Sequence, residues 1–143
     1  MSVPSALPET VVVSVLVAAG LSLVTPPAAS PNAFSGPEQP PGAYIPEAAV
    51  FVVCYGGAYP ITLLGNTQDI RAFDVQVLVR GNVDSVDTTR TLAWNIWTAL
   101  QRKLAPSTWY IDILCKQSGP IYMGQDDTEH VRFSVNASLR FQG

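Results

Sequence analysis

The feature that most constrains the fold is a strict alternation of apolar and polar side chains over Glu129–Gln142. Valine, phenylalanine, alanine and leucine occupy every second position from Val131 to Phe141, and polar residues such as Arg132 and Arg140 lie between them. Because successive side chains of a strand point to opposite faces, the pattern predicts a long strand with one buried and one solvated face. A shift of one residue would bury the whole polar set, so the register is firmly specified.

Two further segments alternate in the same way, and a helix separates them. Ala72–Arg80 and Trp109–Lys116 each place apolar side chains at every second position, which predicts two half-buried strands. The segment between them predicts a helix over 85–104, with Asp84 or Ser85 as its N-cap. The residues that recur at helical spacing, and so define its expected buried face, are Leu92, Ala93, Ile96, Leu100 and Leu104.

The first half of the chain predicts a buried helix and a buried strand. The apolar run over 11–24 is shorter than the roughly 20 residues that span a bilayer, and Pro8 and Glu9 suit the first turn of a helix. We therefore expect an N-terminal helix over 5–22, with a cleaved signal peptide as the alternative. Ala48–Tyr55 is a continuous run of strand formers, which predicts a strand covered on both faces.

A proline-rich segment over 25–46 connects that helix to that strand. Proline at this density excludes a helix and a central strand, so the segment predicts an extended arm or a long surface loop. Phe34 and Tyr44 give the arm apolar anchors that a solvated linker would lack. We expect the arm to be ordered only where it packs, and a neighbouring subunit is one place where it can pack.

The composition favours a chain that works through its surfaces. The chain of 143 residues fits one domain over 1–143, and it is 48% hydrophobic and 13% charged, against about 25% charged in average soluble proteins. Such a surface is hard to keep soluble unless a partner covers it. Trp94 falls outside the apolar face of the predicted helix, so it lies either at an interface centre or beneath the chain's own arm.

The sequence offers one weak candidate for a reactive site, in the turn before the last strand. Gly124 and the polar residues after it predict a hairpin connection, and Asp126, Asp127, Glu129 and His130 are ligand types that a divalent cation uses. Their spacing matches no calcium loop, so a solvated acidic turn is the simpler interpretation. We expect no catalytic site, no metal and no cofactor.

The two cysteines, Cys54 and Cys115, both fall in apolar strand-like runs. We interpret them as buried thiols, and a disulfide between neighbouring strands stays open as the alternative.

Basic residues gather on the polar faces of the predicted strands. They are Arg80, Arg132, Arg140 and Lys116, and Asp74 and Asp112 would offset part of their charge. If the strands share a sheet, the result is either an ordinary solvated face or a patch for an oppositely charged partner. The net charge of −3 and the scatter of the basic residues argue against nucleic acid as the main partner.

Several short motifs over 44–142 resemble the minor capsid and tail terminator proteins of tailed bacteriophages. The motifs are Ile45-Pro46-Glu47-Ala48-Ala49-Val50-Phe51, Gly56-Gly57, Asp74-Val75-Gln76-Val77-Leu78-Val79-Arg80-Gly81, the helix carrying Ala93 to Leu100, and Gly119-Pro120-Ile121 through Gly124-Gln125-Asp126 to Val131-Arg132-Phe133-Ser134-Val135-Asn136. The strand that ends in Arg80-Gly81, followed by a helix, is the most family-like piece.

This resemblance implies an α+β subunit in which an N-terminal helix and a second helix pack on a mainly antiparallel sheet over 48–142. It also implies a hexameric ring that caps the tail tube, halts its polymerisation and meets the head–neck connector. The location would be the tail or neck of the virion, assembled in the host cytoplasm, with no membrane. Because a closed ring uses a head-to-tail contact, we expect one patch beside Trp94 and the other on the arm around Phe34 and Tyr44.

Three other functions remain open on the sequence. A head-completion or stopper protein would also form a neck ring, and its binding partner would distinguish it from a tail terminator. A small metal-dependent hydrolase would use Asp126, Asp127 and His130. A secreted adhesion domain would lose its N-terminal segment to cleavage.

Overall fold

The structure, a computed structural model, describes residues 7–25, 31–36, 48–57, 61–62, 69–107, 110–126 and 128–142. In chain order the elements are α1 (Pro8–Ala18), β1 (Ala33–Ser35), β2 (Ala49–Gly56), β3 (Ile61–Thr62), β4 (Asp69–Val83), α2 (Val86–Leu100), β5 (Lys103–Ser107), β6 (Tyr110–Cys115), β7 (Ile121–Gln125) and β8 (His130–Gln142). These two helices and the predominance of strands confirm the expected α+β class for the described part of the chain.

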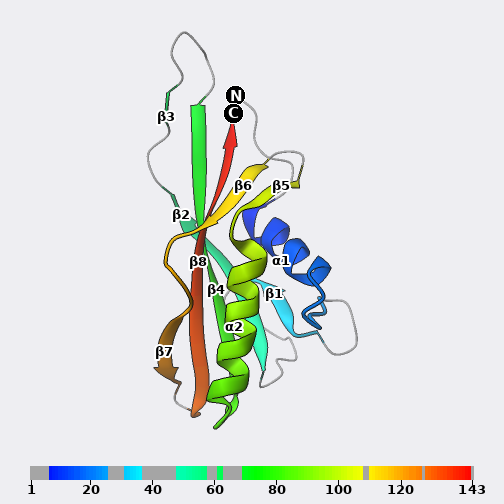
Figure 1. Cartoon of the computed structure of the whole chain (residues 1–143), viewed down its shortest axis with the longest axis vertical. Helices are drawn as coiled ribbons and strands as arrows, with labels where there is room; N and C mark the ends of the chain where they lie inside the picture. Colours follow the sequence, from blue (N-terminus) through cyan, green and yellow to red (C-terminus); the bar gives the residue numbers. More distant parts are fainter. Residues whose placement is uncertain are drawn as a thin grey trace.

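All the strands among the described residues belong to one eight-stranded sheet, in the order β1-β2-β4-β8-β6-β5 (Figure 1). β3 pairs with β4 and β7 pairs with β8, both off this path. In the part of the chain that the structure describes, only the short β1 runs parallel to its neighbour and the other pairs are antiparallel, so the sheet is mainly antiparallel as expected.

The long strands β4 and β8 form the centre of the sheet. They pair with each other from Ile70 opposite Gln142 to Val83 opposite His130. Each also pairs with two shorter strands along its other edge: β2 and β3 on β4, and β6 and β7 on β8. The expected hairpin before β8 is present, and its first strand is β7.

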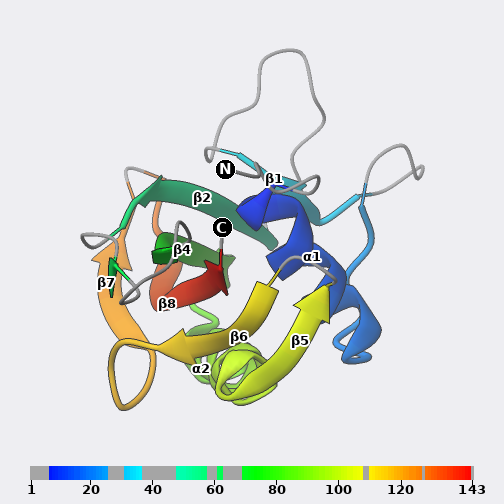
Figure 2. The same ribbon diagram turned by 90° about the horizontal axis from the view of Figure 1, so that it is seen from above.

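The sheet curls around the two helices (Figure 2). Its inner face buries alternate residues of β4 and β8, as the sequence predicts, and these pack against Ala93, Ile96 and Leu100 of α2. Helix α1 contacts β1 and β2 at one end of the sheet and β5 near the other, so it closes the open side of the curl. The main hydrophobic core therefore lies inside the curl, between the sheet and the helices.

Helix α1 agrees with the expected N-terminal helix, although it is shorter than the predicted 5–22. Pro8 lies at its first turn with Glu9, where a missing backbone N–H and a negative charge are both tolerated. Val12 and Leu16 are buried in the core. A continuous apolar run therefore forms a packed helix against the sheet.

The prediction that α2 extends to residue 104 was wrong. The helix ends at Leu100, Arg102 adopts a left-handed conformation, and the chain turns back as β5 along β6. Leu104, expected on the buried face of the helix, lies on β5 and is 73% exposed. Ser85 does lie at the N-cap, but its hydroxyl donates to the Asn82 carbonyl at 2.6 Å and accepts no backbone N–H from the first turn of the helix.

Candidate interaction surface

Trp94 lies on the outward side of α2 and is 44% exposed, as the sequence predicts. Its ring packs edge-on against Trp97, with 5.8 Å between ring centroids, and over Gly119 in the segment between β6 and β7. A Cβ at position 119 would come within 2.5 Å of the indole, so only glycine admits this contact. Trp94 is therefore fixed from beneath by its own chain, while much of its ring faces solvent.

Hydrogen bonds from α2 hold the segment on which Trp94 rests. The indole N–H of Trp97 donates to the Gln117 carbonyl at 2.9 Å. The side-chain carbonyl of Gln101 accepts the Cys115 N–H at 2.7 Å, just before that segment. These bonds join the C-terminal half of α2 to the end of β6, so the helix and the loop form one rigid support.

The aromatic surface continues from α2 onto β7. Tyr122 is 53% exposed, and its ring contacts Phe133 on the inner face of β8 at 5.3 Å between centroids. The Arg90 guanidinium of α2 lies 5.9 Å from the same Phe133 ring. We call Arg90, Trp94 and Tyr122 the α2–β7 surface. Sequence reasoning missed Tyr122 because it treated the three apolar residues between Pro120 and Gly124 as part of a connection.

Phe34 is not available to a neighbouring subunit. It lies on β1, is 5% exposed, and its ring stacks on Phe51 of β2 at 5.4 Å between centroids. With Ala49 and Leu78 these rings form a small second cluster on the outer face of the sheet. The expected interface role of Phe34 is therefore corrected to packing within its own chain. Tyr44 lies outside the described residues.

The sheet brings the predicted basic residues to its outer face. Arg80 and Arg132 are directly opposite each other on β4 and β8, and Arg140 lies further along β8. Asp112 of β6 accepts two bonds from Arg140, one of them from Nε at 2.8 Å, and this pairing raises the pKa of Arg140. The expected offset by acidic residues is therefore observed for Arg140.

Asp74 offsets the next positive charge on the outer face. Its carboxylate accepts hydrogen bonds from Lys116 at 2.7 Å and from the Ser138 hydroxyl at 2.5 Å. Burial alone would raise the pKa of Asp74, but these bonds outweigh it and the pKa is lowered. Lys116 and Arg140 therefore each meet a carboxylate on the outer face, as the sequence analysis expected for part of this charge.

Arg80 and Arg132 lie near the other end of the outer face. Arg80 is 7% exposed, and its guanidinium lies 5.6 Å from the centre of the Phe51 ring. The Nε of Arg132 is buried without a hydrogen-bond partner in the described part of the chain. Of this pair, Arg132 is therefore the residue with a polar group that an acidic partner would satisfy.

The candidate acidic turn is held closed by Asp126. Its carboxylate accepts the backbone N–H groups of Thr128 and His130 and the Thr128 hydroxyl, each at 2.9 Å. The His130 Nδ1 lies 3.3 Å from the second carboxylate oxygen. The Asp126 oxygens therefore serve as turn-closing acceptors at the β7–β8 hairpin.

The chemistry of this turn does not match a nucleophilic triad. Thr128 and Asp126 both contact Nδ1 of His130, while Nε2 is buried and has no hydrogen-bond partner among the described residues. A triad instead needs the hydroxyl and the carboxylate on opposite ring nitrogens. In the described part of the chain, no three His, Cys, Asp or Glu side chains group so as to hold a metal ion. Asp127 lies outside it.

We expect the Asp126 turn to loosen in acid. Burial would raise the pKa of Asp126, but the hydrogen bonds from His130 and Thr128 lower it from 3.8 to about 2. A lowered folded-state pKa stabilises the fold above the unfolded value, and that contribution disappears as the pH falls from about 4 to about 2. Urea unfolding of the wild type and of Asp126→Asn across this range measures the effect.

The Asp126→Asn comparison separates this group from Asp74, whose pKa is also lowered and which both proteins retain. The difference in unfolding free energy between the wild type and Asp126→Asn should shrink as the pH falls from 5 to 2, because the carboxylate of the wild type becomes protonated in that range. A difference that stays constant over that range would contradict the assignment.

Both cysteines are free thiols, and both are half-buried against the core. Cys115 Sγ lies 3.6 Å from the Trp97 carbonyl, and burial raises the pKa of this thiol to about 11. A thiol with so high a pKa is a poor nucleophile at neutral pH. Cys115 therefore packs as a small apolar side chain, as the sequence analysis expected.

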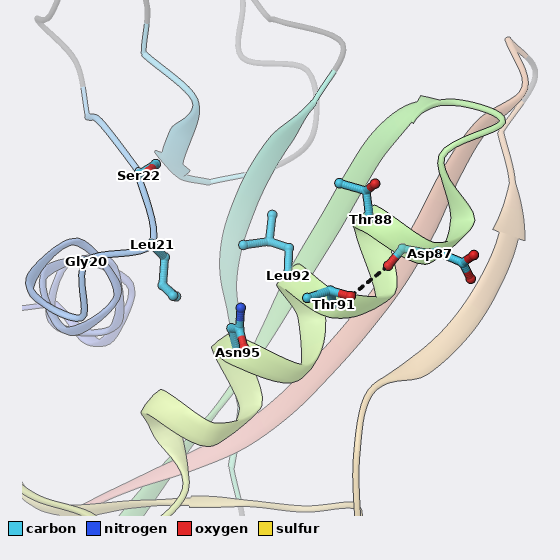
Figure 3. Close-up of a pocket in the computed structure, with 8 residues that line it drawn as sticks. All are labelled: Gly20, Leu21, Ser22, Asp87, Thr88, Thr91, Leu92 and Asn95. Carbon is cyan, nitrogen blue, oxygen red and sulfur yellow. Dashed lines mark hydrogen bonds between the residues drawn. The ribbon is translucent and has the colours of Figure 1, made fainter.

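A shallow groove of about 540 Å³ lies between the end of α1 and the N-terminal half of α2 (Figure 3). The residues that line it are Gly20, Leu21, Ser22, Asp87, Thr88, Thr91, Leu92 and Asn95. The Thr91 hydroxyl is already used, since it donates to the Asp87 carbonyl within the helix at 2.9 Å. The groove thus offers hydroxyls, one amide and one exposed carboxylate, without a nucleophile beside a base.

Among the described residues, neither helix has the length and the apolar character that crossing a bilayer requires. Comparison of the chain with known protein families and with curated proteins gave no match to either.

Proposed function

We propose that this chain is a structural virion protein, a tail terminator whose ring caps the tail tube and meets the head–neck connector. The observation that carries the proposal is the exposed α2–β7 surface, with Trp94 at 44% and Tyr122 at 53% exposure. The sequence resemblance over 44–142 supplies the type of assembly. Together they favour a protein that acts by binding copies of itself and a neighbouring tail component.

The geometry of this surface suits a permanent contact. Tryptophan, tyrosine and arginine are the residues most enriched at the energetic centres of interfaces. Here Trp94 is braced by Trp97 and Gly119, so its ring is held in place before any partner binds. A braced side chain loses little conformational freedom on binding, so more of its burial energy appears as affinity.

A closed ring also needs a second, different patch on each subunit. Because Phe34 is buried in its own chain, the part of the arm that we propose for this patch is the segment around Tyr44. Arg132, half-buried on the outer face of β8 and with its Nε unpartnered in the described part of the chain, is proposed to meet an acidic group of the neighbouring tail component. Arg80 is 7% exposed and packs against Phe51 within its own chain, so it is not part of that contact. Arg140 is already paired with Asp112 and is not part of that contact.

Trp94→Ala tests the proposal. We expect it to weaken subunit association by about 2 kcal/mol or more, which is roughly a 30-fold change in the association constant. Tyr55→Ala is the matched control, because Tyr55 is an aromatic residue of similar exposure (54%) on β2. Light scattering measures the mass of each variant, and an assay of tail tube polymerisation measures capping.

Two outcomes would contradict the proposal. If Trp94→Ala assembles and caps as the wild type does, the α2–β7 surface is not the subunit contact. If the wild-type ring binds a portal or adaptor protein and leaves tube polymerisation unchanged, the chain is a stopper and not a terminator. Urea unfolding of both variants checks that any loss of assembly does not come from loss of the fold.

A further inference from the structure

The described residues leave four strands with one unpaired edge each, and these edges differ in how they are protected. β5 ends one side of the sheet and carries Lys103 and Pro106, with a left-handed residue, Ala105, between them. Lysine, proline and local irregularity are the usual means by which a sheet edge avoids further pairing. β1 spans three residues and β3 two, so both are too short to offer much edge. Three of the four edges are therefore blunted.

β7 lacks the charge and the proline that protect β5. Its five residues, Ile121–Gln125, include no charge and no proline, and it pairs on one side only, with β8. Its free edge presents backbone N–H and C=O groups that water must satisfy in the isolated chain. Its backbone is irregular at the register shift between Tyr122 and Gly124, where Gly124 has a left-handed φ of 79°.

The side chains of β7 are apolar and exposed on both faces. Tyr122 contacts Phe133 on the inner face, and Ile121 is paired with Ser134, whose side chain belongs to the outer face. Ile121, Tyr122 and Met123 are 38%, 53% and 44% exposed. A strand with apolar side chains on both faces is typical of the interior of a sheet, where other strands or helices cover it. β7 thus has the composition of an interior strand and the position of an edge strand.

We propose that the free edge of β7 pairs with an extended strand from a second copy of this chain. A backbone edge is complementary to another strand, whose backbone supplies the missing hydrogen bonds. A second copy is favoured because Tyr122 belongs to the α2–β7 surface, so the edge is continuous with the contact proposed for the ring. Because the β7 edge carries no charge, it can pair with an uncharged strand. It also lacks the charged groups by which a protein usually selects a different partner. This inference rests on the proposed function and specifies how its subunits join.

Met123→Lys tests the pairing, with Leu104→Lys as the matched control. Both variants place a lysine at an exposed apolar position of an edge strand, but β5 already carries a lysine and a proline and β7 carries neither. We expect Met123→Lys to raise the concentration needed for assembly about tenfold or more, because a charged side chain on an edge opposes strand addition. Leu104→Lys should assemble as the wild type does. Equal behaviour of the two variants would overturn the inference.

Amide hydrogen exchange of the wild type gives a second test that needs no variant. Exchange in residues 121–125 should slow on assembly, since the outward N–H groups gain partners. An assembled wild type whose β7 amides exchange as fast as in the monomer would overturn the inference and leave the proposed function standing. An assembly with slowed β7 exchange that fails to cap tubes would overturn the function and leave the inference. A wild type that stays monomeric both alone and on tubes would overturn both.

Discussion

Phe34→Ala is expected to lower the free energy of unfolding of the isolated subunit by about 3 kcal/mol. The ring is 5% exposed and stacks on Phe51, which is fully buried, with 14° between the ring planes. Removing the Phe34 ring uncovers Phe51 on the outer face and leaves a cavity. β1 spans three residues and has no other large side chain to fill that cavity. Urea unfolding of the monomer, at a concentration below assembly, measures the loss.

Tyr55→Ala again provides the control, since this exposed aromatic residue should change the unfolding free energy by under about 1 kcal/mol. The comparison separates the two roles considered for Phe34. A small loss in Phe34→Ala together with weakened assembly would mean that this ring serves a neighbouring subunit after all. A large loss in the monomer establishes the outer-face cluster as a second core.

Gly81→Ala is expected to destabilise the fold by about 2 to 3 kcal/mol, although it adds a single methyl group. A Cβ at Gly81 would lie 1.8 Å from the Thr89 Oγ1 and 2.9 Å from the Ser85 Oγ. Both hydroxyls sit at the start of α2, and Thr89 is buried, so the helix must shift away from β4 to relieve the overlap. Equilibrium unfolding measures the loss.

A double-mutant cycle with Thr89→Ala identifies the cause. Because Thr89 supplies the nearest atom, its truncation should recover part of the stability lost in Gly81→Ala, with a coupling of roughly 1 kcal/mol. Additive losses would show that the two residues do not oppose each other. Wild-type stability of Gly81→Ala alone would contradict the close approach between β4 and α2.

The centre of the fold could be predicted from the sequence because its pattern depends on simple burial. Val131 and the alternate residues through Phe141 are all buried, as period-two alternation requires of a half-buried strand. The long apolar run of β2 likewise indicated cover on both faces, and Val50 and Phe51 are fully buried. In these strands local pattern and tertiary packing agree.

The errors arise where long-range pairing overrides the local pattern. Leu104 continues the helical spacing of α2, and neither glycine nor proline marks the end of the helix at Leu100. The residues after Leu100 form a strand because they pair with β6, and no local feature of the sequence indicates this pairing. β7 was missed for a related reason. The sequence does mark the turn between β7 and its partner β8, but β7 itself is so short that its residues resemble part of a loop.

The candidate surface was predictable only in part. Helical geometry alone placed Trp94 outside the apolar face, and the structure agrees. The role of Phe34 could not be read in the same way, because an apolar residue among prolines indicates that it packs but not on what. The clue was present in β2, whose outer-face Phe51 required a cover that Phe34 supplies.

The dominance of β4 and β8 has a consequence for how the chain reaches its native state. Their pairing joins residues as far apart in sequence as Ile70 and Gln142, so the middle of the sheet forms only after a long loop has closed. Folds ruled by such distant contacts acquire structure slowly. During synthesis β4 leaves the ribosome well before β8, so its apolar face stays uncovered until β8 has been made. Chaperones bind exposed apolar segments of this kind. The yield of soluble protein should therefore depend on synthesis rate and temperature more than on the stability of the finished fold.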